Sequence, residues 1–274
     1  MLREIVKFYN RRVYTNLKWL RGTHLIKRNL EALASFEPVE IVSMNGVEIL
    51  GYGNTAQIRH IILGREMDEY KLLNMIVDEL NPEDIFVDVG ANFGLVTNYI
   101  YENSSAHVTC FEPYPPNIQL LEINKYLFNR NYDVRNLALG SSEGSVEFYA
   151  SVSSQGRGGL AKKKNHKYSE TINVEKSTLD SEIDSVDVIK IDVEGAELEV
   201  LKGAEDTLNQ IKTIFLELHP NSILEEFGTN KKEVIKYLQN NGFSLDVLDG
   251  DISDIEPQEN NQVIAKFEAQ HSKQ

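Results

Sequence analysis

From about residue 84, short apolar runs alternate with stretches whose apolar residues recur at helical spacing. The predicted strands are 85–89, 107–111, 132–137, 186–191, 213–218, 243–248 and 262–267, and the predicted helices are 94–102, 115–128, 197–208 and 231–240. Strands and helices that alternate at this spacing are typical of an α/β fold with a doubly wound, mostly parallel sheet. The last two strands have no helix between them, so we expect a seven-stranded sheet that ends in an antiparallel hairpin.

The alternation breaks between the third and fourth strands. Residues 151–169 combine three glycines with five basic residues and no acidic residue, and they lie between two strand-like pieces at 145–150 and 171–177. Long loops in compact domains are often functional. We therefore expect an inserted loop that is either a basic lid over an anionic or polar substrate or a solvated run of charge.

The N-terminal part differs in pattern and in charge. Residues 1–35 predict one or two helices, and residues 1–30 carry eight basic residues and one acidic residue. Such a segment could bind an anionic membrane surface as a peripheral contact. The alternative is a helical arm that packs its aromatic residues on the main domain. We accordingly divide the chain into an N-terminal helical arm with a lead-in segment, 1–65, and an α/β domain, 66–270.

Composition narrows the class of protein. The chain has 274 residues, 41% of them hydrophobic, and a net charge of −14. A body this acidic should repel a nucleic-acid backbone, so no nucleic-acid partner is expected. The single cysteine, Cys110, excludes an internal disulfide framework, and no apolar run suits a membrane span or a signal peptide. A cytoplasmic protein is expected, with membrane association through the basic segment as the alternative.

The turn after the first strand is the candidate cofactor site. Ligands of open parallel sheets bind beyond the carboxyl ends of the strands. Gly90 follows the strand directly and allows the backbone to approach a ligand, while Gly94 allows the next helix to pack closely. The amides at the start of that helix can receive a carboxylate. The candidate cofactor-binding residues of this turn are Asp88, Gly90, Ala91, Asn92 and Gly94.

Glu112, just past the second strand, completes the candidate cofactor site. A carboxylate there can accept both hydrogen bonds of a ribose diol. A dinucleotide site would have a second glycine where this chain has Asn92, and Asp88 would be unfavourable beside a pyrophosphate. These differences favour a zwitterionic amino-acid cofactor such as S-adenosylmethionine over a dinucleotide.

Four segments together resemble the FkbM family of methyltransferases, a branch of the class I Rossmann-like enzymes. They are 87–94, 111–113, 189–197 and 217–220, within a region of resemblance that extends over about 66–220. The resemblance implies methyl transfer from S-adenosylmethionine, usually to a hydroxyl of a sugar, polyketide or other metabolite. It does not extend over residues 1–60 or over the loop 151–169, which we expect to select the acceptor.

Residues at the ends of the fourth and fifth strands are the candidate reaction site. Lys190 lies inside a strand, so we expect it to pair with Asp88 or Asp192. Asp192 either contacts cofactor and substrate or braces the loop. Glu194 and Glu197 flank Gly195 at the start of a helix, where capping is the simpler interpretation for Glu197.

His219 and Asp192 are the candidate catalytic residues. Glu217 and His219 are two apart and face the same side of the strand. His219 could remove the proton of an acceptor hydroxyl as a general base. Alternatively, these residues with Asp192 and Glu194 could hold a divalent cation, although no ligand spacing requires one.

The leading hypothesis is an S-adenosylmethionine-dependent O-methyltransferase of a sugar, glycan or small metabolite. The alternatives are an RNA or protein methyltransferase and a non-catalytic protein that keeps only the cofactor fold. The acidic body disfavours RNA, and the intact turn and Glu112 disfavour the non-catalytic protein. The oligomeric state is not predicted.

Overall fold

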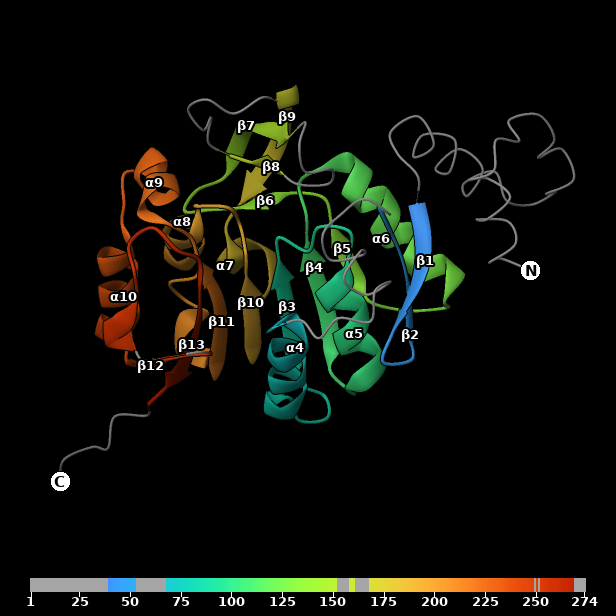
Figure 1. Ribbon diagram of the computed structural model, residues 1–274, viewed down its shortest axis with the longest axis horizontal. Helices are drawn as coiled ribbons and strands as arrows, with labels where there is room; N and C mark the ends of the chain where they lie inside the picture. The colour runs from blue at the N-terminus through green and yellow to red at the C-terminus, as the bar shows by residue number, and fades with distance from the viewer. Residues whose placement is uncertain are drawn as a thin grey trace, which may run out of the picture.

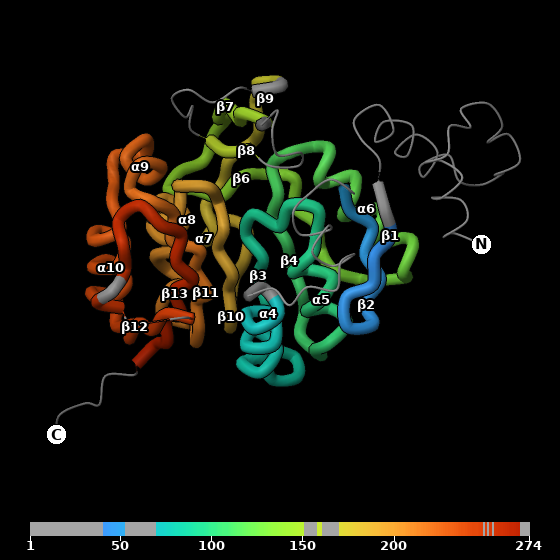
Figure 2. Tube along the Cα trace, viewed as in Figure 1, coloured from blue at the N-terminus to red at the C-terminus, as the bar shows by residue number. Residues whose placement is uncertain are grey.

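The computed structural model describes residues 39–52, 68–151, 158–160, 168–248, 250 and 252–268. A central sheet carries helices on both faces, and a smaller sheet lies beyond one end of its strands (Figures 1 and 2). The basic N-terminal segment and most of the basic loop lie outside these residues. Among the described residues, no helix has both the length and the apolarity that a membrane crossing requires.

The central sheet has the order β12-β13-β11-β10-β3-β4-β5 within the described chain. Its parallel strands are β3 (Ile85–Val89), β4 (His107–Phe111), β5 (Asp133–Arg135), β10 (Val188–Ile191) and β11 (Thr213–Leu218). The last two strands, β12 (Phe243–Val247) and β13 (Asn261–Phe267), pair antiparallel, and β13 also pairs antiparallel with β11. The strand order reverses between β3 and β10, which creates the crevice where ligands of such sheets bind.

Helices cover the two faces of this sheet. The first face carries α4 (Asp68–Glu79), α5 (Leu95–Asn103) and α6 (Pro115–Leu127), and the second carries α7 (Leu179–Glu182), α8 (Glu197–Lys202) and α10 (Lys231–Asn240). Successive strand residues point to opposite faces, so Phe86 joins the first core and Val87 the second. Both faces are buried, which explains why the parallel strands are continuous apolar runs.

A small sheet is formed by residues between 138 and 177, in the region where the alternation of strands and helices breaks. Its strands are β6 (Ala138–Leu139), β7 (Gly144–Ser151), β8 (Gly158–Gly159) and β9 (Tyr168–Ser177), in the order β6-β9-β7-β8. The ring of Phe148 on β7 stacks on Tyr114, with centroids 5.4 Å apart. A Cβ on Gly158 would overlap the Phe148 ring, so glycine is required for this close approach. The stacking fixes the small sheet beside the carboxyl ends of the central strands.

A β-hairpin within the lead-in segment packs on the main domain. It consists of β1 (Val39–Met44) and β2 (Val47–Tyr52), which are joined by Asn45 and Gly46, both at positive φ. The side chain of Asn124 on α6 bonds both the N–H and the carbonyl of Leu50, at 2.7 and 2.9 Å. The hairpin shares one core with α4, α5 and α6. The domain core therefore includes residues on both sides of the division placed at residue 65.

The predicted elements agree closely with the structure in the described residues. The fold class and the seven-stranded sheet are confirmed. The predicted helix 197–208 ends at Lys202, and the glycine that follows it, Gly203, packs against the carbonyl of Gly140 where no side chain fits. The predicted strand 132–137 forms only the shorter β5, Asp133–Arg135, and the chain then enters β6 of the small sheet. The structure adds the short elements α9 (Asn221–Leu224), η2 (Leu208–Gln210), η3 (Glu225–Phe227) and η4 (Ile252–Asp254).

Candidate active site

A cavity opens at the carboxyl ends of β3, β4, β10 and β11, beneath the small sheet. Its described lining is Val89, Gly90, Asn92, Phe111, Glu112, Pro113, Leu137, Ala138, Leu139, Phe148, Gly158, Gly159, Leu160, Asp192, Val193, Glu194, Glu217, His219, Ile223 and Asn260. This lining contains carboxylates and one histidine but no lysine or arginine. The cavity combines three of the predicted cofactor residues, Gly90, Asn92 and Glu112, with both predicted catalytic residues.

The turn after β3 is held tightly against its neighbours. The N–H groups of Gly90 and Ala91 both donate to the carbonyl of Phe111, at 2.9 and 3.1 Å. Gly90 has a φ of 79°, and a Cβ there would overlap the carbonyl oxygen of Asp192. Asn92 also has positive φ, at 55°. Glycine is therefore required at position 90 both by the sharp turn and by the closely packed backbone of Asp192.

Glu112 is fixed at the wall of the cavity by three donors. Its carboxylate accepts hydrogen bonds from the backbone N–H groups of Asn92 at 2.8 Å and Tyr114 at 2.9 Å, and from the amide of Asn117 at 3.2 Å. A carboxylate offers about four acceptor positions, so capacity remains for a ligand hydroxyl. Burial raises the pKa of Glu112 to about 7, against the stabilising effect of the Tyr114 and Asn92 N–H groups. The site thus holds a carboxylate that titrates near neutrality.

Three of the predicted cofactor residues lie behind the cavity wall. Asp88 is fully buried, and its Oδ2 accepts the hydroxyl of Thr97 at 2.6 Å. Gly94 has a φ of 92° and faces α6, where a Cβ would lie 2.5 Å from Leu121 Cδ2. Ala91 is buried and does not line the cavity. These residues support the turn from behind, whereas Gly90, Asn92 and Glu112 line the cavity.

Lys190 joins the two halves of the site. Its ammonium lies 3.3 Å from Asp192 Oδ2 and 3.7 Å from Asp88 Oδ1, so both expected partners are present. Burial disfavours the ammonium, but the carboxylates of Asp192 and Asp88 raise the pKa of Lys190 above its ordinary value. Burial raises the pKa of Asp88, an effect that Lys190 opposes. Lys190 therefore links the cofactor turn to the end of β10.

His219 follows β11 and is oriented by Glu197. Its Nδ1 lies 2.6 Å from Glu197 Oε1, and both side chains are almost completely buried. Glu197 Oε1 also accepts the N–H of Gly195 at 3.0 Å. Burial of the ring disfavours its charged form, but the hydrogen bond to Glu197 and the carboxylates of Asp192 and Glu194 raise the pKa of His219 to about 9. The cavity therefore stabilises positive charge at this ring.

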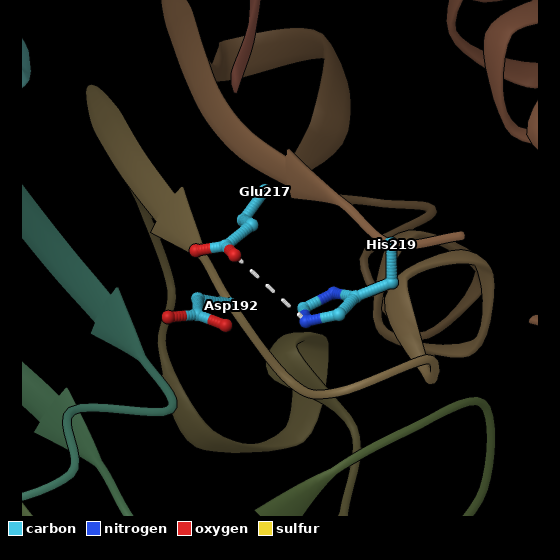
Figure 3. A group of neighbouring side chains, drawn as sticks. All are labelled: Asp192, Glu217 and His219. Atoms are coloured by element: carbon cyan, nitrogen blue, oxygen red, sulfur yellow. Dashed lines mark ion pairs between the residues drawn. The ribbon is translucent and has the colours of Figure 1, made fainter. Parts of the chain in front are cut away.

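Glu217 lies beside His219 and opposite Asp192. Asn260 and Gln262 donate to its two oxygens at 2.7 and 3.2 Å, and His219 Nε2 lies 3.9 Å from Oε1. Burial and the carboxylate of Asp192 raise the pKa of Glu217 to about 7, although His219 opposes the shift. Figure 3 shows the side chains of Asp192, Glu217 and His219 directed toward one another. One ligand-type atom from each lies within 4.8 Å of the others, so the group could hold a metal ion.

Some functional residues were not identified from the sequence. Glu197 was interpreted as a helix cap; its carboxylate does accept the N–H of Gly195 before the helix, but it also binds the ring of His219. Asn260 orients Glu217 from a loop that carries no motif. Gly159 lines the cavity close to Glu194, where a Cβ would lie 3.5 Å from the Glu194 side chain. Of these residues, only Glu197 had a signal in the sequence, because its helix begins shortly after Glu194, which lines the cavity.

Comparisons with known proteins identify a family model and several similar chains. Residues 88–245 match the family model described as the methyltransferase FkbM domain. The hexuronic acid methyltransferase AglP of Haloferax volcanii is 28% identical over 186 residues, which cover 65% of this chain and 71% of AglP. The 2-O-methyltransferase NoeI of Sinorhizobium fredii is 25% identical over 163 residues, 53% of this chain and 67% of NoeI. A crystal structure of an rRNA methylase from Streptococcus thermophilus superposes with a TM-score of 0.44 at 12% identity, covering 74% of this chain and 98% of that one.

Proposed function

Because this chain belongs to the FkbM methyltransferase family, we propose that it transfers a methyl group from S-adenosylmethionine to a hydroxyl of a sugar or glycan. The observation that carries the proposal is one cavity that has Glu112 at its β4 end and Glu217 and His219 at its β11 end, with the turns of Gly90 and Asp192 between them. The names of AglP and NoeI refer to a hexuronic acid and to 2-O-methylation, which supports a sugar hydroxyl as acceptor. The absence of lysine and arginine from the described lining disfavours an RNA acceptor.

The residues of the turn fit S-adenosylmethionine. Asn92 Oδ1 is buried and has no hydrogen-bond partner among the described residues, so it is an acceptor for a polar group of a ligand. The Glu112 carboxylate has the remaining capacity to accept ribose hydroxyls. Gly90, Asn92 and Glu112 would hold the cofactor, while Asp88, Ala91 and Gly94 would fix the shape of the turn.

The chemistry requires alignment and removal of one proton. The bound cofactor supplies a methyl group that is already activated by its positive sulfur. Asp192 and His219 line the same cavity, toward its β11 end, and we assign the acceptor hydroxyl to that end. The cofactor would give up its methyl group to the acceptor oxygen and keep the electron pair of the broken bond on sulfur, while the hydroxyl proton would pass to the protein. We assign the handling of that hydroxyl to Asp192 and to the neutral form of His219, which is the minor form at pH 7 because the pKa of His219 is about 9.

The affinity for S-adenosylhomocysteine is expected to increase with pH between 6 and 8. The ribose hydroxyls donate to the ionised form of Glu112, and its pKa of about 7 means that this form is the minor one at pH 6. One pKa unit corresponds to about tenfold in population. Titration calorimetry should therefore measure a Kd about tenfold lower at pH 8 than at pH 6.

Glu112→Gln provides the control for this dependence. The amide keeps the shape of the side chain but does not ionise, so the variant should bind about 10- to 100-fold more weakly and equally at both pH values. A wild-type Kd that stays constant between pH 6 and 8 would contradict a ribose contact to Glu112.

A methyl-transfer assay with labelled cofactor tests the function itself. We expect the wild-type protein to label a sugar or glycan acceptor, and His219→Ala to lose about 10²- to 10⁴-fold in kcat, the usual contribution of a group that assists proton removal. S-adenosylhomocysteine binding should be unchanged in the variant, because His219 lies at the acceptor end of the cavity.

The companion variant Lys236→Ala, which changes a residue on α10 remote from the cavity lining, should keep full activity. Cofactor binding without transfer to any acceptor that bears hydroxyl groups would refute O-methylation. Loss of cofactor binding in His219→Ala would show instead that His219 contributes to the cofactor site and does not act on the acceptor alone.

A further inference from the structure

Three metal-ligand atoms converge at the acceptor end of the cavity. Asp192 follows β10, Glu217 lies at the end of β11 and His219 follows it, so that two neighbouring strands bring the three side chains together (Figure 3). One ligand atom from each residue lies within 4.8 Å of the other two. Metal–ligand bonds of about 2.0–2.2 Å place neighbouring ligand atoms about 3 Å apart, so an ion bound here would draw the three side chains closer together by up to about 2 Å.

The imidazole of His219 is prepared for ligation by a separate contact. Its Nδ1 is bonded to Glu197 Oε1 at 2.6 Å, which directs Nε2 into the cavity. Only 3% of the His219 side chain is exposed, and within the described chain Nε2 makes no hydrogen bond. Its nearest charged atoms are Glu194 Oε2 at 3.7 Å and Glu217 Oε1 at 3.9 Å. A carboxylate behind a histidine that ligates a metal is the usual outer-shell arrangement.

The balance of charge around the group also favours a cation. The carboxylates that meet here belong to Asp88, Asp192, Glu194, Glu197 and Glu217, and the lysine among them is Lys190. Lys190 lies 3.3 Å from Asp192 Oδ2 and is directed toward Asp88. Buried carboxylates at such density are costly unless a positive charge offsets them. Lys190 supplies one positive charge to this group, and a divalent ion that replaces the proton of the His219 ring would supply two more beside Glu217.

We propose that Asp192, Glu217 and His219 bind one divalent cation of the Mn²⁺ type, and that this cation binds the hydroxyl to be methylated. Mixed carboxylate and imidazole ligands suit such an ion, and three protein ligands leave positions for an acceptor with two adjacent hydroxyls. This assignment rests on the proposed O-methyltransferase function and defines the role of His219 as a ligand.

The proposed step balances without a further reagent. The hydroxyl proton passes to the Glu194 carboxylate, which lies beside the His219 ring. The acceptor oxygen then uses its electron pair to bond the methyl carbon, and the electron pair of the broken methyl–sulfur bond stays on sulfur. The cation keeps its charge throughout and favours the ionised acceptor oxygen.

Mn²⁺ binding to the intact protein tests the site without any catalysis. Chelator-treated protein is titrated with Mn²⁺ in the absence of cofactor and acceptor, and binding is followed by electron paramagnetic resonance. We expect one saturable site that is lost in Asp192→Asn and in Glu217→Gln. Glu197→Gln should weaken binding by about 10- to 100-fold, as expected for an outer-shell residue.

Glu226→Gln is the matched control, because this glutamate is exposed and outside the cavity lining. It should bind Mn²⁺ like the wild type. Retained S-adenosylhomocysteine binding in Asp192→Asn and Glu217→Gln would show that these variants are folded. Absence of saturable Mn²⁺ binding, or equal binding in wild type and Glu217→Gln, would overturn the cation site.

Failure of the cation site and failure of the proposed function give different results. Full methyl transfer in the presence of excess chelator would overturn the cation alone and return His219 to the role of general base. Saturable Mn²⁺ binding in a protein that binds no S-adenosylhomocysteine would overturn the methyltransferase assignment while leaving the cation site in place.

Discussion

A Gly90→Ala variant is expected to lose about 2–5 kcal/mol of unfolding free energy and to bind S-adenosylhomocysteine at least tenfold more weakly. Two costs combine: an alanine at a φ of 79° costs about 1–2 kcal/mol, and relieving an overlap in a packed site costs about 1–3 kcal/mol more. The overlap is with the backbone carbonyl of Asp192, which cannot rotate away as a side chain could. Denaturant unfolding and titration calorimetry measure the two effects.

Gly228→Ala separates the two costs. Gly228 has a φ of 71°, but a Cβ there would meet no atom within 4 Å. This variant should lose only the conformational part, about 1–2 kcal/mol, and should bind the cofactor normally. Equal losses in both variants would mean that the contact between position 90 and Asp192 does not constrain the site.

The central sheet was predictable because its strands are buried on both faces. Ile85–Val89, His107–Phe111 and Thr213–Leu218 were each predicted with the bounds that the structure gives them. In contrast, the helix after β10 ends early, at Lys202, and the backbone of Gly140 lies against Gly203 directly after it. That contact joins two segments more than sixty residues apart, and no local pattern signals it.

The β1–β2 hairpin carried a signal that was not used. Asn45-Gly46 is the strongest short turn signal for a hairpin, and apolar residues alternate on its flanks. The hairpin matters because Asn124 bonds Leu50 and thereby connects the lead-in segment to α6. A domain boundary placed by the start of the α/β alternation misses such a connection.

The candidate site was predictable as far as strand ends define it. Glu112, Asp192, Glu217 and His219 were identified because parallel strands direct their carboxyl ends to one edge. The role of Glu197 was not, because an acidic residue in the first turn of a helix also fits a cap. Its role depends on a contact with His219, 22 residues away, which only the folded chain establishes.

A Lys190→Met variant should lose about 3–5 kcal/mol of unfolding free energy. Methionine keeps the volume of the side chain but removes the only ammonium beside Asp88 among the described residues, and Asp88 is fully buried. Removing one partner of a buried ion pair leaves the other charge uncompensated. Lys202→Met is the matched control, since Lys202 pairs with Glu199 at the surface and should contribute less than about 1 kcal/mol.

Asp88→Asn in the same background tests whether that uncompensated charge is the cause. The double variant should recover part of the stability that Lys190→Met loses, because no buried carboxylate then remains without its cation at position 88. Additive losses would assign the effect to packing instead.

The Lys190→Met substitution alone should also tighten Mn²⁺ binding, because Lys190 lies 3.3 Å from Asp192 and repels a second cation there. A variant that is less stable yet binds Mn²⁺ more tightly would link both halves of the site through one ammonium.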